Sequence, residues 1–268
     1  MSAHDDGSIR VEREDGIVTL TLCRPEKHNA LSYAHFSRLG AEFESVASDP
    51  DVRVMILTGQ GAAFCAGADL TSADPTTQRI SRGPAARGQL LRDITAAARA
   101  LHRIPKPTLA AVNGVAAGAG CNLALGCDIV FAAESARFSE IFVNRGLTMD
   151  YGGTWLLPRL VGLQRAKDIA FRGDVLDAKQ AERAGLVLEV VPDAVLGERV
   201  GEYARMLATK PPIALSFIKS GLNRSSSWGF DEGLEYEADA QAACLGSQDF
   251  REAMQAWINK RPGEYTGE

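Results

Sequence analysis

The sequence predicts an α/β fold for residues 1–192, followed by a purely helical region. Short apolar runs typical of buried strands alternate with amphipathic runs typical of helices. Two of the strand-like runs, residues 52–58 and 108–112, lead into segments rich in small residues. After Pro192 only helical periodicity is found. We therefore expect an α/β core over residues 1–192 and a helical C-terminal region over residues 193–268.

The first half of the chain is predicted to begin with a β-hairpin. Its strands cover residues 9–12 and 17–23, on either side of a turn that ends at Gly16. Ser32 is suited to cap a helix, and five large apolar side chains recur on one face of that helix: Tyr33, Phe36, Leu39, Phe43 and Val46. Residues 90–101 form the next predicted helix, between the two strand-like runs.

The second half continues the alternation and then changes character. A strand is expected at residues 127–133, and a helix at residues 164–172. Asp177 and Gln180 form a capping box for a short helix that ends at Gly185, before a strand at residues 186–191. Four helices follow, at residues 195–208, 212–223, 231–245 and 249–259. Their apolar faces require a partner, which is the core, a neighbouring subunit or both.

Composition narrows the class of protein. The chain has 268 residues and a formal net charge of -5, which argues against a nucleic-acid surface. No apolar run is long enough to span a bilayer, and the start of the chain lacks the form of a signal peptide. Five scattered cysteines without a CxxC pair indicate reduced thiols and a cytoplasmic protein. Four histidines without metal-ligand spacing give no reason to expect a metal site.

The small-residue segment at residues 113–128 is the first candidate for a functional site. It follows a predicted strand and leads into a predicted helix, so its backbone N–H groups lie at a helix N-terminus. Side chains this small let a ligand oxygen approach those N–H groups, which is how half of an oxyanion hole is made. Tight packing of the helix against the sheet explains the same small residues equally well. A second such loop covers residues 59–70.

Four motifs in register give the chain a resemblance to the enoyl-CoA hydratase/isomerase family, also called the crotonase superfamily. They are residues 24–32 (RPEKHNALS), 64–70 (FCAGADL), 110–120 (AAVNGVAAGAG) and 152–154 (GGT). Their order and spacing match the family over residues 9–192, and the helical tail also suits it.

The resemblance implies an α/β crotonase-like spiral of ββα turns with a C-terminal helical trimerisation region. It implies a homotrimer or hexamer, an acyl-CoA thioester substrate, and no cofactor beyond the coenzyme A of that substrate. By position, the backbone N–H groups of Ala68 and Ala119 form the oxyanion hole. The other residues expected to line the site or the CoA groove are Lys27, Ala30, Ala66, Asp69, Leu70, Asn122, Phe142 and Lys260. Lys260 equally suits a solvated surface lysine.

The chain departs from the hydratases of this family at two positions. Those enzymes resemble one another in a pair of glutamates that hold a water, and the pair falls at Asn122 and Phe142 here. The amide of Asn122 can form hydrogen bonds with a ligand but cannot exchange a proton at neutral pH, and Phe142 can do neither. The side chains needed to add water are therefore missing at their usual places.

One carboxylate, Asp150, stands where several isomerases and a dehalogenase of the superfamily bear a functional aspartate. The segment at residues 146–159 looks most like that of the ring-1,2-epoxyphenylacetyl-CoA isomerases, which also act as Δ3-Δ2-enoyl-CoA isomerases. A single acid can move the proton of a double-bond shift while an oxyanion hole holds the enolate. We expect Phe142 and Trp155 to surround Asp150 and to raise its pKa by desolvation. The alternative role for Asp150 is a helix N-cap.

Other interpretations remain open on the sequence. An enoyl-CoA hydratase would need another acid, such as Glu140, for which we expect instead a surface or structural ion pair. A dehalogenase would use Asp150 as a nucleophile, but no histidine is placed to activate the hydrolytic water. A non-catalytic acyl-CoA-binding protein would keep the fold without turnover. The glycine spacing excludes a Rossmann dehydrogenase, and the absence of GxSxG excludes a Ser-His-Asp hydrolase.

Overall fold

The computed structural model describes residues 7–69 and 83–268, and its larger sheet has six strands. Their order is β1 (Ile9–Glu14), β2 (Ile17–Leu22), β3 (Val54–Gly59), β5 (Thr108–Val112), β7 (Ile129–Ala133) and β10 (Glu189–Val191). Only β1 and β2 pair antiparallel, as the predicted hairpin, and the other neighbours are parallel. β10 is shorter than the strand predicted at residues 186–191.

The structure also has a second sheet of four short strands, which the sequence did not predict. It contains β4 (Ala63–Cys65), β6 (Val115–Ala117), β8 (Arg137–Ser139) and β9 (Leu176–Asp177). β4, β6 and β8 each follow a strand of the larger sheet in the chain, and each is three residues long. Segments of this length carry no measurable alternation. The chain thus passes through one sheet and then the other in successive turns.

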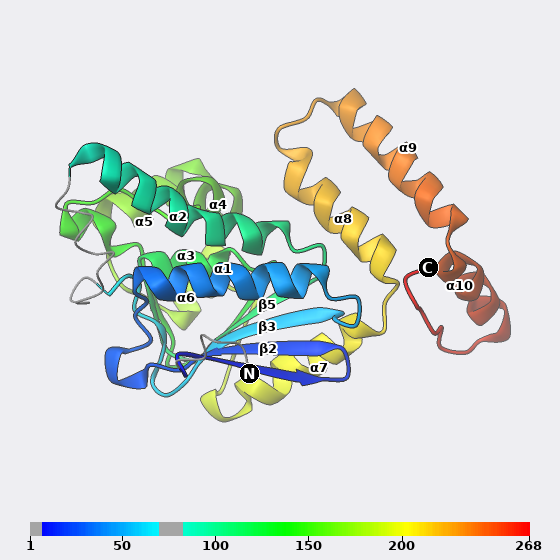
Figure 1. Cartoon of the computed structure of the whole chain (residues 1–268), viewed down its shortest axis with the longest axis horizontal. Coiled ribbons are helices and arrows are strands. Elements are labelled where there is room, and N and C mark those ends of the chain that lie inside the picture. Colours follow the sequence, from blue (N-terminus) through cyan, green and yellow to red (C-terminus); the bar gives the residue numbers. More distant parts are fainter. Residues whose placement is uncertain (1–6, 70–82) are drawn as a thin grey trace.

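The α-helices described before β10 are α1 (Tyr33–Ser48), α2 (Pro84–Arg103), α3 (Ala119–Leu125), α4 (Gly153–Val161), α5 (Leu163–Arg172) and α6 (Ala178–Ala184). α1 and α2 pack against each other, and they lie on one side of the larger sheet in Figure 1. The predicted apolar face of α1 is confirmed, with Phe36, Leu39, Phe43 and Val46 buried. The capping box at Asp177 and Gln180 also forms as predicted. A large apolar core joins these helices to the sheets.

The C-terminal helices fall into two groups. α7 (Leu196–Ala208) packs on the other face of the larger sheet through Leu196, Val200 and Ala204. This face needs a cover because the strands beneath it are apolar on both faces. α8 (Pro212–Ser225), α9 (Phe230–Gly246) and α10 (Gln248–Asn259) extend away from the core in Figure 1. We call these three helices the C-terminal extension.

The extension has no buried side chain on α8 or α9 and presents large apolar side chains to solvent. The most exposed are Leu222, Phe230, Trp257 and Ile258, which keep between 67% and 81% of their surface. None of the helices described has both the length and the apolar composition needed to cross a bilayer.

Candidate active site

The first predicted oxyanion residue, Ala68, lies in an extended segment that pairs with the loop before α1. Leu31 donates its N–H to the carbonyl of Gly67 at 2.8 Å and accepts from the N–H of Asp69 at 2.9 Å. This parallel bridge between Leu31 and Ala68 is made by the carbonyl of Gly67 and the N–H of Asp69, and the N–H of Ala68 takes no part in it. The N–H of Ala68, an exposed residue, therefore points away from Leu31, and no described residue accepts a hydrogen bond from it.

The second predicted oxyanion residue, Ala119, is the first residue of α3. Gly118 caps this helix with φ of 53°, and the first N–H groups of a helix have no partner within it. The two loops approach closely, because a Cβ on Gly67 would lie 2.7 Å from the carbonyl oxygen of Ala117 and 3.5 Å from the nitrogen of Ala119. Gly67 also has φ of 95°, which glycine adopts without strain. The structure thus brings the two small-residue loops together.

The loop at residues 24–31 runs beside the Ala68 segment, where a CoA groove was expected. Ala66 donates its N–H to the carbonyl of His28 at 3.0 Å. The guanidinium of Arg24 bonds to the carbonyl of Ala30 and forms an ion pair with Asp69, whose side chain is 6% exposed. Asp69 thus contributes to holding these segments together. Lys27 is exposed, Ala30 and Ala66 are half-buried, and Leu70 lies outside the described residues.

Asn122 links α3 to the segment that carries Asp150. It is fully buried, and its side-chain Nδ2 donates to the backbone carbonyl of Asp150 at 2.9 Å and to Glu140 Oε2 at 3.3 Å. The same carbonyl of Asp150 accepts the N–H of Gly153 at 2.9 Å. Two donors therefore fix the backbone of Asp150 next to the N-terminal half of α3.

The side chain of Asp150 does not cap a helix. The N-cap of α4 is Gly152, and no side chain forms a cap bond there. Within residues 7–69 and 83–268, Asp150 Oδ1 is buried without a hydrogen-bond partner. Burial raises the pKa of the Asp150 carboxyl to about 6. A carboxyl with this pKa and a free oxygen is suited to accept and return a proton near neutral pH.

The expectation of an ion pair for Glu140 is wrong. The side chain is 2% exposed, and no described cation lies within ion-pair distance of it. Burial, with a smaller contribution from the charge of Asp150, raises its pKa to about 7, against the opposing hydrogen bonds of Cys121 and Asn122. This burial could not be predicted from the sequence, because Glu140 follows β8, a strand of only three residues that shows no measurable alternation.

Phe142 lies at the candidate site, whereas Trp155 packs against other residues. Phe142 is buried in a short 3-10 helix (Ile141–Arg145), and a Cβ on Gly118 would lie 3.6 Å from the tip of its ring. Phe142 therefore covers the N-terminus of α3 with an apolar side chain. Trp155 instead packs edge-on against His102 and lies under the guanidinium of Arg159. None of its ring contacts within the described residues involves Asp150.

Sequence reasoning missed Tyr151 altogether. It has φ of 49°, which is unusual for a residue with a large side chain. Its side chain is buried, and the centroids of its ring and the Phe36 ring lie 5.4 Å apart. The hydroxyl is buried and has no hydrogen-bond partner among residues 7–69 and 83–268. No pattern in the sequence marks a left-handed tyrosine, because its conformation is set by the turn from Asp150 to Gly153 around it.

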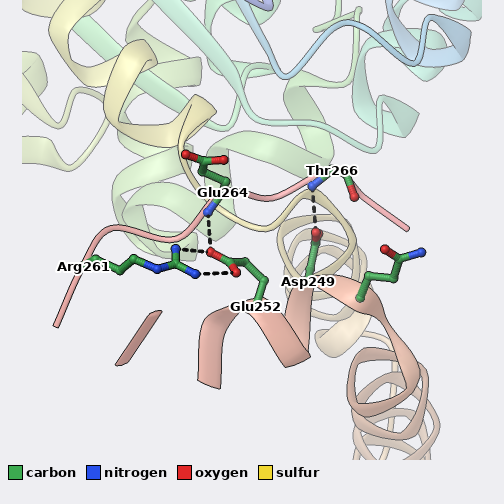
Figure 2. A pocket seen from close by; sticks show the side chains of 6 residues that line it. Asp249, Glu252, Arg261, Glu264 and Thr266 are labelled. Carbon is green, nitrogen blue, oxygen red and sulfur yellow. Dashed lines mark hydrogen bonds and ion pairs between the residues drawn. The ribbon is translucent and has the colours of Figure 1, made fainter. Parts of the chain in front are cut away.

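Lys260 lies far from these residues in a single chain. It is the C-cap of α10, at the opposite side of the molecule from α3 and α4 (Figure 1). The pocket beside α10 belongs to the folded-back tail, as Figure 2 shows. There Arg261 pairs with Glu252 at 2.8 Å, and Thr266 donates its N–H to Asp249 at 2.8 Å. The acids Glu252 and Asp249 thus already have partners within the chain. Their contacts hold the C-terminal tail against α10.

Comparison with known proteins establishes the family. The model of the enoyl-CoA hydratase/isomerase family matches residues 12–268. The chain belongs to this family. The crystal structure of the enoyl-CoA hydratase from Bacillus anthracis superposes with a TM-score of 0.91 at 33% identity, over 97% of this chain and 100% of that one. The predicted crotonase-like fold is therefore confirmed.

Relatives within the enoyl-CoA hydratase/isomerase family include proteins named as isomerases and proteins named as hydratases. The 1,2-epoxyphenylacetyl-CoA isomerase of Escherichia coli (strain K12) is 41% identical, over 95% of this chain and 96% of the relative. The crotonyl-CoA hydratase of Syntrophomonas wolfei is 35% identical, over 96% and 97% respectively. Membership of this family shows that the chain is an enzyme that handles acyl-CoA. Which reaction it catalyses depends on the side chains in the site. In the part of the chain that is described, no three His, Cys, Asp or Glu side chains gather as a metal site would require.

Proposed function

We propose that this chain is an acyl-CoA isomerase that shifts a double bond, or opens a ring epoxide, through an enolate. The observation that carries the proposal is the carboxyl of Asp150, which has a buried free oxygen and a pKa raised to about 6. The proposal is supported by the residues at the two hydratase positions, Asn122 and Phe142, which cannot move a proton. The name of the isomerase from Escherichia coli, 41% identical, agrees with it.

In the proposed reaction Asp150 removes the proton on the carbon next to the thioester carbonyl of a 3-enoyl-CoA. The C–H electron pair moves into the carbon chain, and the thioester oxygen takes up negative charge. The N–H groups of Ala68 and Ala119 stabilise that charge, and one such donor is typically worth about 3 kcal/mol in the transition state. Asp150 then returns the proton to the γ carbon, which leaves a conjugated 2-enoyl thioester. Phe142, whose ring lies next to Gly118 at the start of α3, limits access of water to the enolate.

The second candidate is an enoyl-CoA hydratase, and one observation favours it. Glu140 is a second buried carboxyl whose Oε1 has no hydrogen-bond partner among the described residues, and its pKa is raised to about 7. An acid of this kind is able to exchange a proton with a water at neutral pH. Addition of water to a 2-enoyl-CoA by the protein would support this function, and loss of that activity in a Glu140 variant would assign it.

The test is a paired assay with Asp150→Asn. Wild type should convert a 3-enoyl-CoA to its conjugated isomer and should not hydrate a 2-enoyl-CoA. Because the base acts when ionised, isomerisation should fall as the pH drops through about 6. Asp150→Asn should lower kcat by roughly 100-fold or more while thioester binding persists.

The matched control for this test is Asp168→Asn, which changes an exposed aspartate on α5. This variant should behave as wild type. Near-normal isomerisation by Asp150→Asn would refute the assigned role. Thioester binding without turnover of enoyl or epoxide substrates would favour a non-catalytic acyl-CoA-binding protein.

We further propose that the C-terminal extension joins the chain into a homotrimer or hexamer. The support is the apolar surface on its helices, where Phe230 is 81% and Trp257 is 75% exposed. Single exposed apolar residues are common, but several on consecutive helices are typical of an interface.

A further inference from the structure

Glu140 is a buried acid with no role in the proposed proton transfer. It immediately precedes the 3-10 helix Ile141–Arg145 and is 2% exposed. Its Oε2 accepts a hydrogen bond from Asn122 Nδ2 at 3.3 Å, and its Oε1 has no hydrogen-bond partner among the described residues. A carboxyl buried without a cation is costly to keep, which calls for a reason why an acid stands here.

Asn122 connects this acid to the backbone of Asp150. Its Nδ2 has two hydrogens and faces two acceptors, Glu140 Oε2 and the carbonyl oxygen of Asp150 at 2.9 Å. The opposite orientation of the amide would place Oδ1 against two oxygens and satisfy neither. Both acceptors therefore favour the same orientation of the amide: Glu140 holds one hydrogen of Nδ2 while the other is donated to the carbonyl of Asp150.

We propose that Glu140 is a positioning residue for Asp150, acting through the side-chain amide of Asn122. The inference rests on the proposed isomerase function, in which the Asp150 carboxyl must reach both the α and the γ carbon of one substrate. With an apolar side chain at residue 140, the amide of Asn122 loses one of its two acceptors. The amide is then held only by its bond to the carbonyl of Asp150, so its position beside that carbonyl is less restrained. A small displacement of a catalytic group is sufficient to slow an enzyme.

Glu140 also gives the site a second ionisation. The groups that act on its charge are the carboxyl of Asp150 and, from α3, the Cys121 thiol and the Asn122 amide. The charged side chains of α5 and α6, which pack near this segment, are exposed. The pKa is raised to about 6 for Asp150 and to about 7 for Glu140, so the two carboxyls ionise over neighbouring pH ranges. Activity should therefore show a second inflection near pH 7, which belongs to Glu140.

The experiment compares Glu140→Met with Glu140→Gln in the isomerase assay. Met keeps the length of the side chain and removes the acceptor, whereas Gln keeps an oxygen that can accept from Asn122. Glu140→Met should lower kcat roughly tenfold or more with KM changed less than about threefold. Glu140→Gln should recover most of that loss. Both variants should lack the inflection near pH 7 that wild type shows. Glu134→Gln, at an exposed glutamate, is the matched control and should behave as wild type.

A second variant, Asn122→Leu, breaks the same link while Glu140 is intact. It should lower kcat about as much as Glu140→Met, and the double variant should lose little more, because both remove one connection. Wild-type turnover by Glu140→Met, or equal losses in the Met and Gln variants, would overturn the positioning role. So would losses that add in the double variant. The wild type and Asp150→Asn in the same assay separate the two proposals: absence of isomerisation by the wild type overturns the isomerase function, and an active Asp150→Asn variant overturns the catalytic role of Asp150.

Discussion

Gly153 shows how closely the residues around Asp150 are packed. A Cβ on this residue would lie 2.4 Å from Nδ2 and 2.6 Å from Oδ1 of Asn122, far inside van der Waals contact. The φ of Gly153 is not positive, so glycine is required here for space rather than for conformation. The helix α4 thus begins with its backbone against the amide that holds Asp150.

Gly153→Ala is therefore expected to displace the side chain of Asn122 and to misplace Asp150. We predict that kcat for isomerisation falls by roughly tenfold to 100-fold, while the protein still binds a CoA thioester. Gly197→Ala is the control, because a Cβ on this α7 glycine would meet nothing within 4 Å. Steady-state kinetics of the two variants check the prediction, and normal turnover by Gly153→Ala would contradict it.

At the scale of elements, the C-terminal extension is attached to the core through α8. Lys219 reaches back from α8 to Asp128 Oδ2 at 2.6 Å and to the carbonyl of Lys106 at 2.9 Å. Thr108, the first residue of β5, donates to the same carboxylate from both its N–H and its hydroxyl at 2.8 Å. The ammonium is mostly buried, with its side chain 12% exposed, so this pair is worth more than an ordinary surface ion pair.

Lys219→Met should loosen α8 without unfolding the core. Loss of one partner leaves Asp128 without its cation, which costs about 1–3 kcal/mol. Amide hydrogen exchange in α8 should become faster, while the exchange of β3 and β5 stays unchanged. Lys210→Met removes an exposed lysine just before α8 and serves as the control. Unaltered protection of α8 in Lys219→Met would show that other contacts hold the helix.

At the scale of the whole molecule, the apolar side chains of the core are buried, whereas many of those on the C-terminal extension are exposed to solvent. The two faces of the larger sheet are covered by α1 with α2 and by α7, and both apolar clusters are formed within one chain. The extension has no such cover in a single copy, and α10 carries Trp257 and Ile258 outward at 75% and 67% exposure. Burying such surface is the main source of free energy for subunit association.

Trp257→Glu is predicted to shift the protein toward smaller assemblies. Wild type should sediment with three or six times the mass of one chain, and a buried charge at residue 257 would oppose association. Gln255→Glu, at an exposed residue of the same helix, adds the same charge and should leave the mass unchanged. Sedimentation over a range of concentrations checks both variants. Wild type that remains a monomer at all concentrations would contradict the predicted oligomer.

The family, the longer elements and the absence of acids at residues 122 and 142 can all be recognised from the amino-acid sequence. The apolar period of α1, the capping box at Asp177 and the β1–β2 hairpin are local patterns, and the structure reproduces each of them. Asn122 and Phe142 can be identified as non-acidic from the sequence alone. Such features are encoded within a few neighbouring residues, or in the identity of one residue.

Tertiary structure decided which groups meet at the site. The short strands of the second sheet exist only because each pairs with a partner far away in the chain. These strands lead into the loops of Ala68 and Ala119 and into the segment of Glu140. Burial of Glu140 and the bridge through Asn122 both arise from contacts between distant segments. Burial and hydrogen bonding between distant residues are properties of packing, and no local pattern records them.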